Sequence, residues 1–143
     1  MKRGEGWVLA QIVVFAAFAG APGDRMSWHS PGIVVSALGI VIAAAAAAHL
    51  GQSLTPLPTP NARGKFTRRG LYRFVRHPIY TGVLGAGFGA AWATHSPVRF
   101  AIIMALALFF DAKARFEERH LHNHYPEYLN YCRDVRRFVP FIY

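Results

Sequence analysis

Cysteine and acidic residues are scarce in this chain. A single cysteine, Cys132, excludes an internal disulfide and a cysteine-rich metal site. Only 7 residues are Asp or Glu against 16 Lys or Arg, which gives a net charge of +9. Charged residues make up 16% of the 143 residues and hydrophobic residues 53%. The few charges must therefore be segregated from long apolar runs.

Four apolar runs can be found between the charged segments. Residues 7–21, 31–50 and 79–94 carry no charge, and 98–110 carries only Arg99, near an end where its side chain can reach the membrane surface. The 20 residues of 31–50 suffice to cross a hydrocarbon core about 30 Å thick, whereas the other runs need flanking residues. We expect an all-α, polytopic membrane protein with about four transmembrane helices.

The distribution of basic residues favours one orientation in the membrane. The segment 51–76 contains six Lys or Arg and no acid, and both ends of the sequence are basic too. By the positive-inside rule, this segment and both termini lie in the cytoplasm, and we expect the cytoplasmic membrane of a prokaryote. Attraction to anionic lipid headgroups accounts for the same charges, so we expect a lipid bilayer and no nucleic acid as partner.

The first apolar run has two interpretations. Residues 1–6 and 7–19 resemble the basic and apolar regions of a secretory signal peptide, and small residues near position 21 suit cleavage. We favour a retained span and keep cleavage as the alternative. The rest of the topology is the same in both cases.

Two polar clusters flank the last two apolar runs. If 79–94 and 98–110 are antiparallel helices joined at 95–97, His77 lies 19 residues before Ser96 and Glu117 lies 21 residues after it. At about 1.5 Å per residue, the two differ in depth by only about 3 Å. We therefore expect Arg76, His77, Glu117 and its neighbour to converge at one membrane surface, as a site or as an ion-pair staple. The last helix should continue past 121 and end near Tyr125-Pro126.

The sequence around these clusters resembles a known family. Arg76-His77-Pro78-Ile79-Tyr80, Glu117-Glu118, Tyr125-Pro126-Glu127-Tyr128 and Pro140 are similar to the isoprenylcysteine carboxyl methyltransferase and phospholipid methyltransferase superfamily, over residues 54–140. The resemblance implies a helical membrane enzyme with a cytoplasmic S-adenosylmethionine pocket. It implies one domain, 1–143, with an N-terminal transmembrane hairpin (1–53) and a cofactor-binding catalytic region (54–143).

The resemblance also implies roles for individual residues. The methyl acceptor would be lipophilic, carrying a prenylcysteine-like carboxylate, a phospholipid amine or another small group, and Lys113 or Arg115 would face it. Catalytic roles fall to Arg76, His77 and Glu117. Cofactor contacts fall to Gly64, Lys65, Phe66, Thr67, Tyr72, His77, Pro78, Ile79, Tyr80, Glu117 and Glu118.

The chemistry of these side chains agrees with such a cofactor. Its carboxylate can be bound by Arg76 and His77, and its ammonium by Glu117. The methyl group is already activated by the positive sulfur, so transfer needs alignment rather than a nucleophile from the protein.

Other interpretations remain open. Taken singly, interfacial arginines and tyrosines are common membrane anchors. A membrane reductase that uses a nicotinamide cofactor would share a related helical scaffold, and a non-catalytic scaffold could form homo-oligomers through the small residues Gly82, Ala86 and Ala90. His120, His122 and His124 lack the HExxH arrangement, so we expect no metal.

Overall fold

The computed structural model describes residues 4–55, 57 and 66–143, and within these residues the fold is built from helices without strands. Two predicted cofactor residues, Gly64 and Lys65, lie outside the described residues. The all-α prediction is confirmed for the described part of the chain. The elements are α1 (Glu5–Gly20), α2 (Pro31–Leu50), η1 (Gly51–Ser53), η2 (Gly70–Arg73), α3 (Pro78–Ala93), α4 (Pro97–His124) and α5 (Tyr128–Asp134).

Local sequence explains where the long helices begin. α2, α3 and α4 start at Pro31, Pro78 and Pro97. Proline is favourable there because the first helical N–H has no partner within the helix. Ser30 and Ser96 cap α2 and α4 by accepting a hydrogen bond from a backbone N–H in the first turn, at 3.2 Å in each case.

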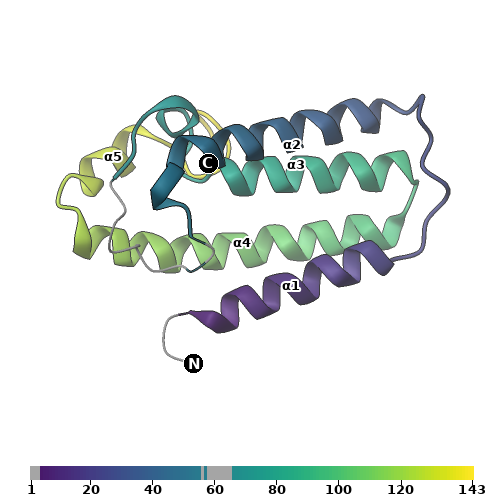
Figure 1. Ribbon diagram of the computed structural model, residues 1–143, viewed down its shortest axis with the longest axis horizontal. Coiled ribbons are helices and arrows are strands. Elements are labelled where there is room, and N and C mark those ends of the chain that lie inside the picture. The colour runs from purple at the N-terminus through teal and green to yellow at the C-terminus, as the bar shows by residue number, and fades with distance from the viewer. Residues whose placement is uncertain (1–3, 56, 58–65) are drawn as a thin grey trace.

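The two C-terminal long helices form the framework on which the others pack. α3 and α4 are antiparallel and joined by a tight turn at 94–96, as the sequence predicts. α2 lies along α3, and α1 lies along α4 (Figure 1). Each N-terminal helix therefore packs on a different member of the α3–α4 pair.

Small residues allow α2 and α3 to approach closely. A Cβ atom added to Gly39 would collide with the backbone of α3 at Gly82 and Ala86, and one added to Gly82 would collide with the backbone of α2. Gly32 and Gly89 form a second contact of the same kind. The small-residue stripe of α3 is thus covered by α2, so it is not a free face for a second copy of the chain.

The outer surfaces of the helices are apolar. A continuous belt of exposed apolar side chains is rare on soluble proteins and is typical of a surface that contacts lipid. Among the described residues, one helix, Pro31–Ser53, is both long enough and apolar enough to cross a membrane, with a mean hydropathy of 2.3. The count of four spans stays a prediction. Exposed apolar side chains occur on α1 (Leu9, Ile12, Val13), α2 (Val34, Leu38, Val41), α3 (Phe88, Trp92) and α4 (Met104, Leu108).

The C-terminal segment returns to the start of α3. α4 continues to His124 and ends before Pro126, as expected, and α5 follows. The chain then runs beside the residues that precede α3: the backbone N–H of Arg76 donates to the carbonyl of Arg136 at 2.8 Å, and that of His77 to Arg137 at 3.0 Å. The start of α3, the end of α4 and the C-terminal segment therefore meet at one end of the bundle (Figure 1).

Candidate active site

His77 lies between two carboxylates at this end of the bundle. Its ring Nε2 is 3.0 Å from Oε1 of Glu118, and its Nδ1 is 3.6 Å from Oε2 of Glu117. The side chain is buried, with 8% of the residue exposed. The predicted convergence of the two clusters is confirmed.

Glu117 lies beside the rings of His77 and Tyr80 and has one strong hydrogen-bond donor. The hydroxyl of Tyr80 donates to its Oε1 at 2.5 Å. The Tyr80 ring is itself held between the ring of His77, at 5.4 Å, and that of Phe110, at 4.3 Å. Burial raises the pKa of Glu117, and the opposing influence of His77, Tyr80 and Lys113 does not fully offset it. A further positive charge beside this carboxylate would therefore be stabilising.

Glu118 has a different environment, dominated by arginine. Arg76 Nε donates to its Oε1 at 3.0 Å, and Arg137 donates to both of its oxygens, at 3.1 and 2.9 Å. Burial opposes ionisation of Glu118, but hydrogen bonds from His77 and Arg137 outweigh it and lower its pKa to about 2. Glu118 is therefore an ionised anchor with its charge already compensated.

The guanidinium of Arg76 binds other groups of the protein. Besides its contact with Glu118, its Nη1 donates to the backbone carbonyls of Cys132 and Val135, at 3.0 and 3.1 Å. A guanidinium engaged in this way holds the C-terminal segment against the start of α3. For Arg76, the structure favours the ion-pair staple over the cofactor contact suggested by the sequence.

The segment 66–77 is held on α5 by aromatic packing. The hydroxyl of Tyr131 donates to the backbone carbonyl of Tyr72. Burial raises the pKa of Tyr72, and the charges of Tyr131 and Glu117 raise it further. Thr67 is half-buried in the same segment. Phe66 has ring centroids 5.2 to 5.6 Å away in Tyr125, Tyr128 and Tyr131.

The two predicted acceptor-facing residues have separate environments. Lys113 is 2% exposed; its Nζ donates to Oε1 of Gln11 on α1 at 2.8 Å and lies 5.4 Å from the centre of the Tyr80 ring. Arg115 is exposed and pairs with Asp111 at 2.7 Å. Of these two residues, only Lys113 lies beside Tyr80.

Pro78 and Ile79, which were predicted to contact the cofactor, form the first turn of α3. Pro78 is buried and Ile79 is half-buried.

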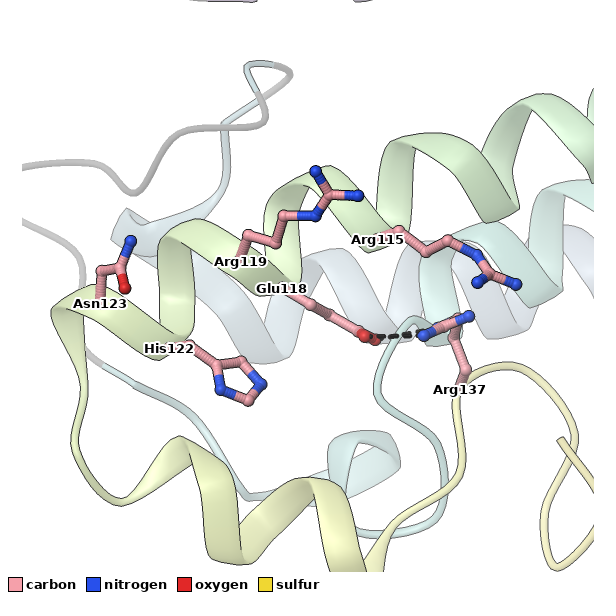
Figure 2. Close-up of a pocket in the computed structure, with 6 residues that line it drawn as sticks. All are labelled: Arg115, Glu118, Arg119, His122, Asn123 and Arg137. Atoms are coloured by element: carbon pink, nitrogen blue, oxygen red, sulfur yellow. Dashed lines mark hydrogen bonds and ion pairs between the residues drawn. The ribbon is translucent and has the colours of Figure 1, made fainter.

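An open hollow of about 580 Å³ lies beside Glu118. Figure 2 shows Glu118 and Arg137 reaching toward each other from α4 and from the C-terminal segment. The sequence analysis missed Arg137, because a basic residue in a basic tail is explained equally well by topology. The hollow is lined by Arg115, Glu118, Arg119, His122, Asn123 and Arg137.

Gln11 was missed as well, although a signal was present. It is the one polar side chain in the run 7–21. A lone amide in an apolar helix is costly to bury unless it meets a polar partner. That partner is Lys113.

The three histidines at the end of α4 do not face one another. His120 contacts the carbonyl of Phe116 in its own helix, at 2.9 Å. His122 lies 3.7 Å from the sulfur of Cys132, and the ring of His124 packs on Tyr125. Residues 4–55, 57 and 66–143 contain no group of three or more His, Cys, Asp or Glu side chains that could hold a metal ion.

Comparison with known proteins identifies the family. The family model for phospholipid methyltransferases matches residues 28–128, which include α2, α3, α4 and the first residue of α5. The chain belongs to the phospholipid methyltransferase family. The resemblance noted in the sequence is thereby confirmed, and the buried His77 and the half-buried Glu117 both lie inside the matched range.

Relatives of this phospholipid methyltransferase family member include enzymes of prenylated cysteine. Protein-S-isoprenylcysteine O-methyltransferase A from Arabidopsis thaliana is 30% identical, with 94% of this chain and 68% of that protein covered. The B enzyme of the same plant is 28% identical with the same coverage. A cobalt-zinc-cadmium resistance protein, CzcN, from Cupriavidus metallidurans is 35% identical over 75 residues, half of this chain and a third of that protein.

The fold is also found in a solved membrane protein. A eukaryotic intramembrane Ras methyltransferase, an isoprenylcysteine carboxyl methyltransferase, superposes with a TM-score of 0.71 at 21% identity. The comparison covers 99% of this chain and 55% of that one. The family member described here thus spans about half the length of that structure, and shares its helical fold.

Proposed function

We propose that the protein transfers the methyl group of S-adenosylmethionine to a lipophilic acceptor at the cytoplasmic face of a membrane. The observation that carries this proposal is the half-buried, incompletely compensated carboxylate of Glu117 beside His77 and Tyr80. Such a carboxylate fits the cofactor's ammonium group, because a buried acid gains most from a paired cation. Family membership supports the same activity.

Glu117, Tyr80 and His77 form the centre of the proposed site. Glu117 would accept the ammonium, Tyr80 would fix the orientation of the Glu117 carboxylate, and His77 would hold both glutamates in place. The cofactor, when bound, supplies a methyl group on a positively charged sulfur. The protein aligns the donor and acceptor and excludes water, which can lower a barrier by about 7 to 11 kcal/mol in favourable cases.

The remaining predicted residues divide into contacts and supports. Glu118 and Arg76 would act as supports, because they bind each other and the C-terminal segment. Tyr72 would contact the cofactor near Glu117, and Pro78 and Ile79 would set the start of α3. The other proposed contacts are Gly64, Lys65, Phe66 and Thr67.

The acceptor would approach from the bilayer on the side of Lys113. A buried ammonium favours an anionic acceptor and disfavours a protonated amine. We therefore place a carboxylate on a prenylcysteine-like lipid ahead of a phospholipid amine, in keeping with the substrate named for the Arabidopsis relatives. Arg115 would bind the acceptor only from the exposed side of α4, where Asp111 already pairs with it.

The membrane arrangement proposed here has four spans in one domain, with α1, α2, α3 and the apolar part of α4 crossing a prokaryotic cytoplasmic membrane. The basic segment 51–76, the end of α4 and both termini would face the cytoplasm. Labelling of cysteines introduced at Ser27 and at Leu54, in a Cys132→Ser background, tests this orientation. Membrane-impermeant reagent should reach Ser27→Cys from outside intact cells and leave Leu54→Cys unlabelled.

Calorimetry with purified protein in detergent tests the activity at its first step. The protein should bind S-adenosylmethionine and its demethylated product, and both Glu117→Ala and His77→Ala should abolish binding with the fold intact. Tyr143→Phe, which removes a hydroxyl bonded to Asp111 and not to Glu117, should bind as the unaltered protein does. Binding of NADPH instead of S-adenosylmethionine would move the assignment to a reductase, and binding of neither would favour a scaffold. Labelled methyl donor with lipid extracts then identifies the acceptor.

A further inference from the structure

α1 contributes one polar group to the candidate active site. Gln11 lies in the middle of this apolar helix, and its Oε1 accepts a hydrogen bond from Nζ of Lys113 at 2.8 Å. α1 is fixed in this place by Trp7, whose ring centre is 5.4 Å from that of Phe109 and 5.9 Å from that of Phe116. The helix therefore presents Gln11 to α4 in a defined position.

Lys113 connects Gln11 with the carboxylate of Glu117. It precedes Glu117 by one helical turn on α4, so the two side chains are neighbours on one face. Its ammonium also lies over the ring of Tyr80, whose hydroxyl donates to Glu117. Contacts therefore run from Gln11 through Lys113 and Tyr80 to Glu117.

The charge of Lys113 is sensitive to its surroundings. Burial lowers the pKa of Lys113, and the attraction of Glu117 opposes that shift. An oxygen that accepts a hydrogen bond from the ammonium favours the charged form and fixes its place. Gln11 supplies that oxygen without a charge of its own, so the positive charge of Lys113 stays available to Glu117.

We infer that Gln11 is a positioning residue of the cofactor site: it holds the ammonium of Lys113 beside Glu117 and thereby keeps Glu117 ionised for a cationic group of the ligand. This inference rests on the proposed function, because the cationic group is the cofactor's ammonium. The titratable groups that face Glu117 are His77 ahead of α3, Tyr80 on α3, Tyr72 on η2, and Lys113 and Glu118 on α4. Gln11 acts on one of them, Lys113.

Two measurements on Gln11→Met test the inference. Infrared difference titration against a Glu117→Gln reference reports the ionisation of Glu117 without any cofactor. Calorimetry gives the affinity for S-adenosylmethionine as a function of pH. Both the midpoint of Glu117 ionisation and the acid limb of binding should move up by about one pH unit, because a nearby unit charge shifts a buried group by this order. Leu9→Ala, an exposed position on the same helix, should leave both unchanged.

A double-mutant cycle separates positioning from general destabilisation. Lys113→Met should shift both midpoints in the same direction, and Gln11→Met combined with Lys113→Met should shift them no further than Lys113→Met alone. Additive shifts, or an unchanged Glu117 midpoint in Gln11→Met, would overturn the inference. Gln11→Ala serves as the second variant if Gln11→Met folds poorly. A shifted Glu117 midpoint in protein that never binds S-adenosylmethionine would defeat the proposed function and leave the coupling of Gln11 to Glu117 standing.

Discussion

Glu117 and Glu118 are neighbours on α4, yet they meet different partners. Glu117 accepts the hydroxyl of Tyr80 at 2.5 Å, whereas Glu118 binds Arg137 at 2.9 Å. Successive helical residues point about 100° apart, so one carboxylate can face Tyr80 on α3 while the next faces the C-terminal segment. The pair therefore combines a proposed binding group with a structural anchor.

Neutralising the two glutamates should have opposite consequences. Glu117→Gln should weaken S-adenosylmethionine binding by about 10- to 100-fold, because a hydrogen bond to a charged group is worth about 1.5 to 3 kcal/mol. Its stability should be unchanged or higher, since burial disfavours the charge of Glu117. Glu118→Gln should lose about 3 kcal/mol of stability, because it removes the counter-charge of Arg76 and leaves Arg137 paired with Asp111 alone.

Calorimetry and thermal unfolding in detergent, run on both variants, check this division. The folded fraction of Glu118→Gln should keep its affinity for the cofactor within a few-fold. A stable Glu118→Gln protein, or a destabilised Glu117→Gln protein that still binds, would show that the roles are reversed.

The Tyr80 hydroxyl should matter for binding and little for folding. Tyr80→Phe keeps the ring that packs between His77 and Phe110 and removes only the donor to Glu117. We expect about 10-fold weaker S-adenosylmethionine binding, since a charge-assisted hydrogen bond that orients Glu117 is lost. Tyr143→Phe removes a hydroxyl that donates to Asp111 and not to Glu117, and is the matched control. Equal affinity of both variants in a radioligand filtration assay would remove Tyr80 from the site.

The sequence was sufficient for the main framework of this protein. The apolar runs predicted α2, α3 and α4, and the short connection at 95–97 predicted the antiparallel order of α3 and α4. Counting along the chain placed His77 and Glu117 at one depth, because a helix has a fixed rise per residue. These features depend on local sequence and on distance along the chain.

The separate roles of the polar residues could not be predicted from local sequence and spacing. Arg76 and Glu118 carry the same family signature as His77 and Glu117, and only the fold shows that they bind each other and the carbonyls of the C-terminal segment. The contact between Gln11 and Lys113 joins residues 102 positions apart. Such pairings depend on how the helices pack, which spacing along the chain does not determine.

Acid should destabilise the protein through Glu118. The pKa of this carboxyl is about 2 in the folded chain against an ordinary value of 4.5. Because the folded-state pKa is the lower one, ionised Glu118 stabilises the fold fully above about pH 4.5, and this stabilisation is lost as the pH falls toward 2. Unfolding temperatures measured from pH 6 to pH 2 should fall more steeply for the unaltered protein than for Glu118→Gln. Parallel curves would mean that Glu118 carries no such linkage.

Glycines at the contact between α2 and α3 should differ sharply in their tolerance of alanine. A Cβ at Gly82 would meet the backbone of α2 at Ala43, with its nitrogen only 2.5 Å away, whereas a Cβ at Gly85 would meet only Gly39 Cα at 3.7 Å. Gly82→Ala should therefore push the helices apart and cost about 1 to 3 kcal/mol. Gly85→Ala should be neutral or stabilising by up to about 1 kcal/mol, since alanine is the better helix former. Thermal unfolding of the two variants side by side is the measurement. Equal stabilities would mean that α2 and α3 do not touch along this face, and the stripe would again be available to a second copy of the chain.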